Sequence, residues 1–106
     1  MRRVILGVAA GMLVSAGAGL AIAHSAVCSC FDNGDATVTC EGGFSDGSSA
    51  AGVVIRVLDV RDKLLLEGKM DGTGTFTFDK PEVEYHVVFD AGSSHIVTID
   101  SADITA

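Results

Sequence analysis

From residue 27 onward, apolar and polar side chains alternate in short runs that are separated by turn residues. Alternation with a period of two is typical of β-strands that bury one face. Between these runs a turn signal recurs about every ten residues, and no run has the helical period of 3.6. The pattern predicts an all-β fold, a seven-stranded antiparallel β-sandwich. The expected strands are Val27–Phe31, Thr37–Phe44, Val53–Val60, Lys63–Met70, Thr75–Phe78, Glu84–Asp90 and His95–Ile99.

One face of each later strand is apolar, and these faces predict the core. We expect the segment Ser45–Gly52, which is small and polar, to be a loop or a crossover between sheets. His86 falls on the opposite face from its aromatic neighbours and is expected to face solvent. The predicted core side chains are Val53, Ile55, Val57, Phe76, Phe78, Tyr85 and Phe89.

The first 23 residues have a different pattern. Arg2 and Arg3 precede an uncharged run, residues 4–23, that ends in Ala21-Ile22-Ala23. A basic start, an apolar stretch and small residues at its end are typical of a helical secretory signal peptide. We therefore expect residues 1–23 to be a leader and residues 24–106 to be a single exported, periplasmic or extracytoplasmic domain. The apolar run is also long enough to stay in place as a membrane anchor.

The net charge of the expected domain restricts the kinds of molecule that it can bind. Residues 24–106 carry five basic residues against all 14 acidic residues of the chain, which gives a formal charge of −9. Such a surface repels nucleic acids and anionic membranes, and it attracts cations or keeps the protein soluble. We expect no nucleic-acid partner.

Three cysteines, Cys28, Cys30 and Cys40, are an odd number for an exported chain, so one is left over whichever pair oxidises. Asn33-Gly34 predicts a hairpin between the first two strands. With a three-residue loop, Cys28 faces Cys40 and a Cys28–Cys40 disulfide is possible. With a two-residue turn, Cys40 faces Val27 instead, and Cys28 and Cys30 turn to the opposite side.

The same cysteines are candidate metal ligands. Cys28 and Cys30 project from one face of a strand, and His24 lies four residues upstream of Cys28, next to the expected new amino terminus. Imidazole, thiolate and a terminal amine are good ligands for nickel, cobalt, copper and zinc. Cleavage after Ala21 would place His24 third from the terminal amine, whereas cleavage after Ser25 would remove it.

Nothing in the sequence predicts catalysis. There is no Ser-His-Asp order, no nucleotide-binding glycine pattern and no paired zinc-ligand motif. His95 follows a glycine-containing turn, where a side chain that bonds a local carbonyl is the ordinary interpretation. We expect a protein that is not an enzyme.

The chain contains the motifs Glu41-Gly42-Gly43-Phe44-Ser45-Asp46-Gly47, Ala50, Val57-Leu58-Asp59, Leu64-Leu65-Leu66-Glu67-Gly68-Lys69, Asp71-Gly72-Thr73-Gly74-Thr75-Phe76 and Val88-Phe89-Asp90-Ala91-Gly92-Ser93-Ser94-His95. The middle segments, over about residues 50 to 90, are similar to carboxypeptidase-regulatory-like, transthyretin-like β-sandwich domains. With His24 in front and the Asp-Ala-Gly-x-x-His ending, the chain resembles the small periplasmic accessory components of nickel and cobalt energy-coupling-factor transporters.

This resemblance implies an Ig-like or transthyretin-like sandwich that assists a membrane transporter in nickel or cobalt uptake. It also implies that His24 and His95 are the metal ligands, to which the residues themselves add Cys28 and Cys30 as candidates. The three cysteines stand where ordinary strand residues are expected, and Met70 replaces a usual threonine. The alternative is a non-catalytic extracytoplasmic interaction or structural module that binds no metal.

Overall fold

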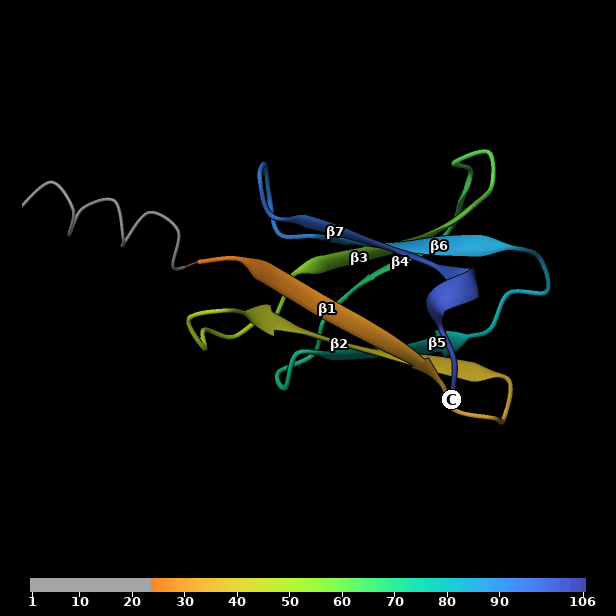
Figure 1. The fold of residues 1–106 in the computed structure, drawn as a ribbon, viewed down its shortest axis with the longest axis horizontal. Coiled ribbons are helices and arrows are strands. Elements are labelled where there is room, and N and C mark those ends of the chain that lie inside the picture. The colour runs from red at the N-terminus through yellow and green to blue at the C-terminus, as the bar shows by residue number, and fades with distance from the viewer. Residues whose placement is uncertain (1–23) are drawn as a thin grey trace, which may run out of the picture.

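The computed structural model describes residues 24–106, which form seven antiparallel strands in two sheets, an arrangement consistent with a β-sandwich. The predicted leader, residues 1–23, lies outside the described residues. Figure 1 shows the two layers facing each other. The strands are β1 (Ala26–Asp32), β2 (Thr37–Phe44), β3 (Val54–Asp59), β4 (Leu64–Lys69), β5 (Thr75–Asp79), β6 (Tyr85–Asp90) and β7 (Ile96–Asp100), followed by a short 3₁₀ turn, η2 (Ser101–Asp103).

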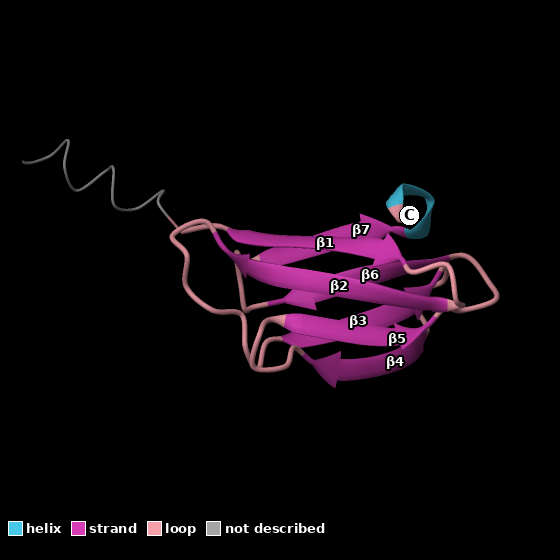
Figure 2. Ribbon diagram, turned by 90° about the horizontal axis from the view of Figure 1, so that it is seen from below, coloured by secondary structure: helices cyan, strands magenta, loops and turns pink. Residues whose placement is uncertain are grey.

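The chain crosses from one sheet to the other more than once, so each sheet contains strands from different parts of the sequence. One sheet has the order β1-β2-β5, and the other has the order β4-β3-β6-β7. The small polar segment 45–52 links β2 of the first sheet to β3 of the second, which confirms the predicted crossover. Figure 2 shows the three-stranded sheet in front of the four-stranded one, with the strands of both running roughly along the domain.

The core lies between the sheets and is apolar. Along β6, burial alternates strictly, with Tyr85, Val87 and Phe89 inside. Val53 and Phe76, which we predicted to be buried, are only partly so, and Val53 lies one residue ahead of β3. No polar or charged side chain of residues 24–106 is buried. The buried side chains are Cys30, Val38, Cys40, Ala50, Ile55, Val57, Met70, Phe78, Tyr85, Val87, Phe89 and Ile104.

The disulfide differs from the predicted one: Cys30, not Cys28, is bonded to Cys40. Asn33 and Thr37 close the β1–β2 hairpin, so the loop starts one residue later than expected. Gly34 and Ala36 both have positive φ in this loop. The later start places Cys30 opposite Cys40. Cys28 lies opposite Gly42 and keeps a free thiol.

The outer face of the four-stranded sheet is tied together by one arginine. Arg56 of β3 donates from Nε to Glu67 of β4 at 2.7 Å and from an Nη to Asp90 of β6 at 2.8 Å. The bond from the guanidinium holds the pKa of Asp90 below its usual range. Asp90 therefore stays ionised at the end of β6, where the chain turns back into β7.

Candidate functional site

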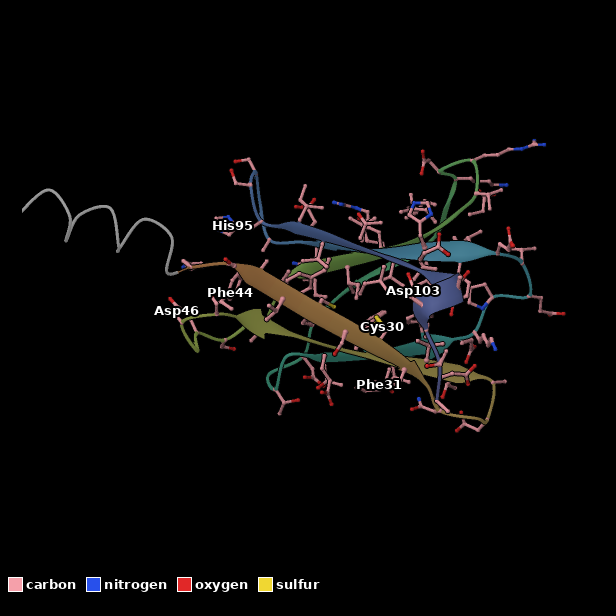
Figure 3. The ribbon with its side chains drawn as sticks, in the orientation of Figure 1. Cys30, Phe31, Phe44, Asp46, His95 and Asp103 are labelled. Carbon is pink, nitrogen blue, oxygen red and sulfur yellow. A yellow bond between two sulfur atoms is a disulfide. The ribbon has the colours of Figure 1, made fainter. Side chains whose placement is uncertain are left out.

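The two candidate histidines, His24 and His95, meet at one end of the domain. Their ring centroids are 5.1 Å apart, and the rings are arranged edge to face at 71°. We call this end, made of His24, the 45–52 segment and the 91–95 turn, the histidine end. Figure 3 shows His95, Phe44 and Asp46 there, close to the point where the described chain begins.

His95 is oriented by its own turn. Gly92 and Ser94 have φ of 109° and 73°, so the backbone reverses within a few residues. The amide of His95 donates to the carbonyl of Gly92 at 2.9 Å, and the amide of Gly92 donates to the Asp90 carboxylate at 3.0 Å. The ring Nδ1 lies 3.2 Å from the carbonyl oxygen of Ser93. Because a carbonyl only accepts, this contact is a hydrogen bond when Nδ1 carries the hydrogen, and in that neutral tautomer Nε2 has the free lone pair.

His95 can therefore bond a local carbonyl and bind a metal ion at the same time. The side chain does bond a local carbonyl through Nδ1, as expected of a histidine at a turn. Metal-binding histidines commonly use one ring nitrogen in this way while the other nitrogen coordinates the ion.

His24 is held by the segment that follows β2. The Ser25 amide donates to the Ser45 hydroxyl, and the Ser45 amide donates to the Ser25 carbonyl, both at 2.8 Å. These bonds pin the start of the described chain to the crossover. The His24 ring lies 4.8 Å from the ring of Phe44, centroid to centroid.

A carboxylate faces His24. Oδ2 of Asp46 lies 3.4 Å from Nδ1 of His24, while Oδ1 accepts bonds from the amide and the hydroxyl of Ser48. The Ser48 hydroxyl contributes most to lowering the pKa of Asp46, and the nearby His24 adds to this effect. The ionised Asp46 therefore favours a hydrogen on Nδ1 of His24, which leaves the lone pair of Nε2 to coordinate a metal ion.

The cysteines lie away from this pair of imidazoles. Cys30 cannot supply a thiolate because it is disulfide-bonded, so the expectation that it is a metal ligand is wrong in this oxidised state. Cys28 faces the space between the sheets and is only partly exposed, and burial raises the pKa of its thiol to about 11. A protonated thiol is a poor ligand and a poor nucleophile.

His86 lies far from the histidine end. Its partner in the register is Asp100, where β7 ends, and its Nε2 is 3.0 Å from Asp62 in the β3–β4 turn. The side chain lies on the outward face of β6, as predicted. His86 is therefore a natural control for experiments on the other two histidines.

Sequence reasoning missed Asp46 and Phe44 as parts of the candidate site. Both lie in a motif that we quoted for the resemblance alone, and the separation of Asp46 from His24 along the chain gave no local signal. Within residues 24–106, no three His, Cys, Asp or Glu side chains gather into a group able to hold a metal ion. The same residues contain no helix long and apolar enough to cross a bilayer.

One hollow shares the 45–52 segment with the histidine end, but neither His24 nor His95 lines it. It has a volume of about 550 Å³ and is open to solvent, between β1, β2 and the segment after β2. Glycines and serines line much of it, together with Cys28 and Glu41. The Cys28 thiol in this lining stays protonated near neutral pH, because burial raises its pKa to about 11.

Comparisons with known proteins gave no relative: no family model matches the chain, and no curated protein or solved structure is significantly similar.

Proposed function

We propose that this protein is a non-catalytic, extracytoplasmic accessory protein that binds a nickel or cobalt ion through His24 and His95 and serves a membrane transporter. One observation carries the proposal. Two imidazoles from opposite ends of the domain sequence lie 5.1 Å apart, centroid to centroid, at one end of the fold. We further propose that the two sheets form an Ig-like or transthyretin-like sandwich.

The chemistry of the two rings supports a metal ligand pair. Each Nδ1 faces an oxygen, the carbonyl of Ser93 for His95 and the carboxylate of Asp46 for His24. Such contacts fix the ring orientation and the tautomer, and they make Nε2 a stronger metal ligand. Imidazole suits nickel, cobalt, copper and zinc alike, so the choice of nickel or cobalt rests on the resemblance alone.

The disulfide supports an extracytoplasmic location. Disulfides persist in oxidising compartments and are rare in the cytosol. The Cys30–Cys40 bond agrees in this respect with the leader expected in residues 1–23. Because the described chain enters the domain at His24, an uncleaved leader would hold the histidine end next to the membrane, where a transporter operates.

Titration calorimetry with Ni²⁺ and Co²⁺, on protein whose amino terminus has been verified by mass spectrometry, tests the proposal. We expect one ion per chain, and at least tenfold weaker binding for His24→Ala and for His95→Ala, about 1.4 kcal/mol. The affinity should fall as the pH is lowered, because protons compete for the imidazole nitrogens.

His86→Ala is the matched control and should bind like the wild type, since this histidine contacts Asp62 at a distance from the site. Equal affinity of the wild type and both variants, or no binding below millimolar ion concentrations, would refute the metal site. Those results would favour the interaction module without metal.

A further inference from the structure

We infer that the His24–His95 pair is an open half-site, in which the bound ion keeps coordination positions for nitrogen or sulfur donors of a second protein. This inference rests on the proposed function and adds that the ion is shared between this protein and a second protein. The argument depends on the number of donors, their orientation and their exposure.

The chain supplies too few donors to close the site. Late first-row divalent ions take four or more ligands in proteins. Residues 24–106 bring no three metal-binding side chains together, and residues 1–23 contain no His, Cys, Asp or Glu at all. A terminal amine on His24, created by cleavage after residue 23, would chelate an ion together with Nδ1 of the same residue, so it would not complete a site built on the two Nε2 atoms.

The nearest carboxylate is already engaged. Both oxygens of Asp46 have neighbours, Oδ1 the amide and hydroxyl of Ser48, and Oδ2 the Nδ1 of His24. Asp46 is therefore better placed to orient His24 than to bind the ion itself. The cysteines do not complete the site either, because Cys30 is oxidised and Cys28 faces the interior.

The pair of imidazoles is accessible from solvent. The His24 side chain is 47% exposed and Asp46 is 40% exposed. On the inner side, the rings are backed by Phe44, which lies 4.8 Å from His24 and 6.3 Å from His95, centroid to centroid. An ion held between the two imidazoles would have an apolar ring on one side and would be reachable from solvent, where another protein could supply imidazole or thiolate donors.

Visible absorption spectroscopy of bound Co²⁺ tests the inference, because the d–d bands report the ligands of the ion. The protein is used as purified from its native envelope, with its terminus determined by mass spectrometry, and free imidazole stands in for the donors of a partner. We expect imidazole to change the Co²⁺ spectrum saturably. Co²⁺ should also bind at least tenfold more tightly in the presence of imidazole, as a complex of one protein and one ion.

Variants separate the half-site from unspecific binding. His24→Ala and His95→Ala should each reduce the imidazole-dependent change at least tenfold, and His86→Ala should retain it. A Co²⁺ spectrum that stays unchanged at saturating imidazole would overturn the inference and leave the proposed function standing. So would a complex of two protein copies per ion that resists imidazole, whereas the absence of any Co²⁺ binding would overturn both.

Discussion

Position 42 of β2 has no room for a side chain. A Cβ on Gly42 would overlap the ring of Phe89, which is fully buried and cannot move aside, and would also touch Met70. Overpacking of this kind typically costs 1–3 kcal/mol. We therefore expect Gly42→Ala to lower the free energy of unfolding by roughly 1–3 kcal/mol, measured by urea denaturation.

The neighbouring glycine is the matched control. A Cβ at Gly43 would meet nothing within 4 Å, and this residue has no positive φ. Gly43→Ala should leave the stability unchanged or raise it slightly, because alanine loses less backbone entropy on folding. Equal destabilisation by both substitutions would contradict the packing argument.

Cys28 provides a second prediction for a single residue. Burial raises the pKa of its thiol from the ordinary 9.0 to about 11. Only the thiolate reacts with iodoacetamide, so at pH 8 alkylation should be about a hundredfold slower in the folded protein than in denaturant. Mass spectrometry of timed samples measures both rates, and similar rates would show that the thiol is not desolvated.

The same shift has a defined effect on stability. A thiol that holds its proton more tightly when folded stabilises the protein below the unfolded pKa, and this contribution is lost as the pH rises from about 9 through 11. Wild type should therefore lose more stability than Cys28→Ala over this range. Parallel decline of the two proteins would contradict the assignment.

At the scale of elements, the β1–β2 hairpin carries the cross-link. The Cys30–Cys40 disulfide closes a short loop of the chain, for which a stabilisation of about 2–4 kcal/mol is typical. We expect the double variant Cys30→Ala/Cys40→Ala to lose roughly that amount in urea denaturation. Cys28→Ala, which keeps the disulfide, is the control and should lose less.

Peptide mapping of the non-reduced protein checks the pairing directly. A cross-linked peptide containing Cys28 and Cys40 would contradict the structure, and so would three titratable thiols in denaturant. The expected result is one titratable thiol.

Strand positions could be read from the sequence, but strand register could not. The alternation along β3, β5 and β6 places their apolar faces directly, because the period of a strand is fixed by its backbone. The register of β1 against β2 depends on where the hairpin loop begins. Asn33, read as part of the turn, instead pairs with Thr37 and donates from its side chain to the hydroxyls of Thr37 and Thr39.

In the candidate site, too, some residues could be predicted from the sequence and others could not. His24 was predicted from its place beside the cysteines and the expected terminus, whereas His95 was predicted from the resemblance alone, since residues far apart in sequence give no periodic signal. Asp46 was missed because its role depends on the crossover between sheets and on the bonds between Ser25 and Ser45. Long-range placement of this kind follows only from the tertiary fold.

On the scale of the whole molecule, aromatic side chains join the two sheets. Phe78 of β5 packs at right angles to Tyr85 of β6, with ring centroids 6.2 Å apart, and both rings are buried. A domain of this size has a net stability of only a few kcal/mol. Phe78→Ala should cost roughly 3–5 kcal/mol, enough to unfold most of the protein at room temperature.

Leu58→Ala is the comparison for this truncation. Leu58 lies on the outward face of β3 and is only partly buried, so its loss should lower the melting temperature much less. Circular dichroism during heating measures both variants. Melting of Phe78→Ala at the wild-type temperature would show that the sheets do not depend on this contact.

In the proposed site, the meeting of His24 and His95 would set when this pair can hold an ion. The two residues stand near opposite ends of the domain sequence, so only the folded chain brings the pair together. Ion binding at this pair would favour folding more strongly as the free ion concentration rises. The compartment in which the chain folds would then decide which ion the pair takes up.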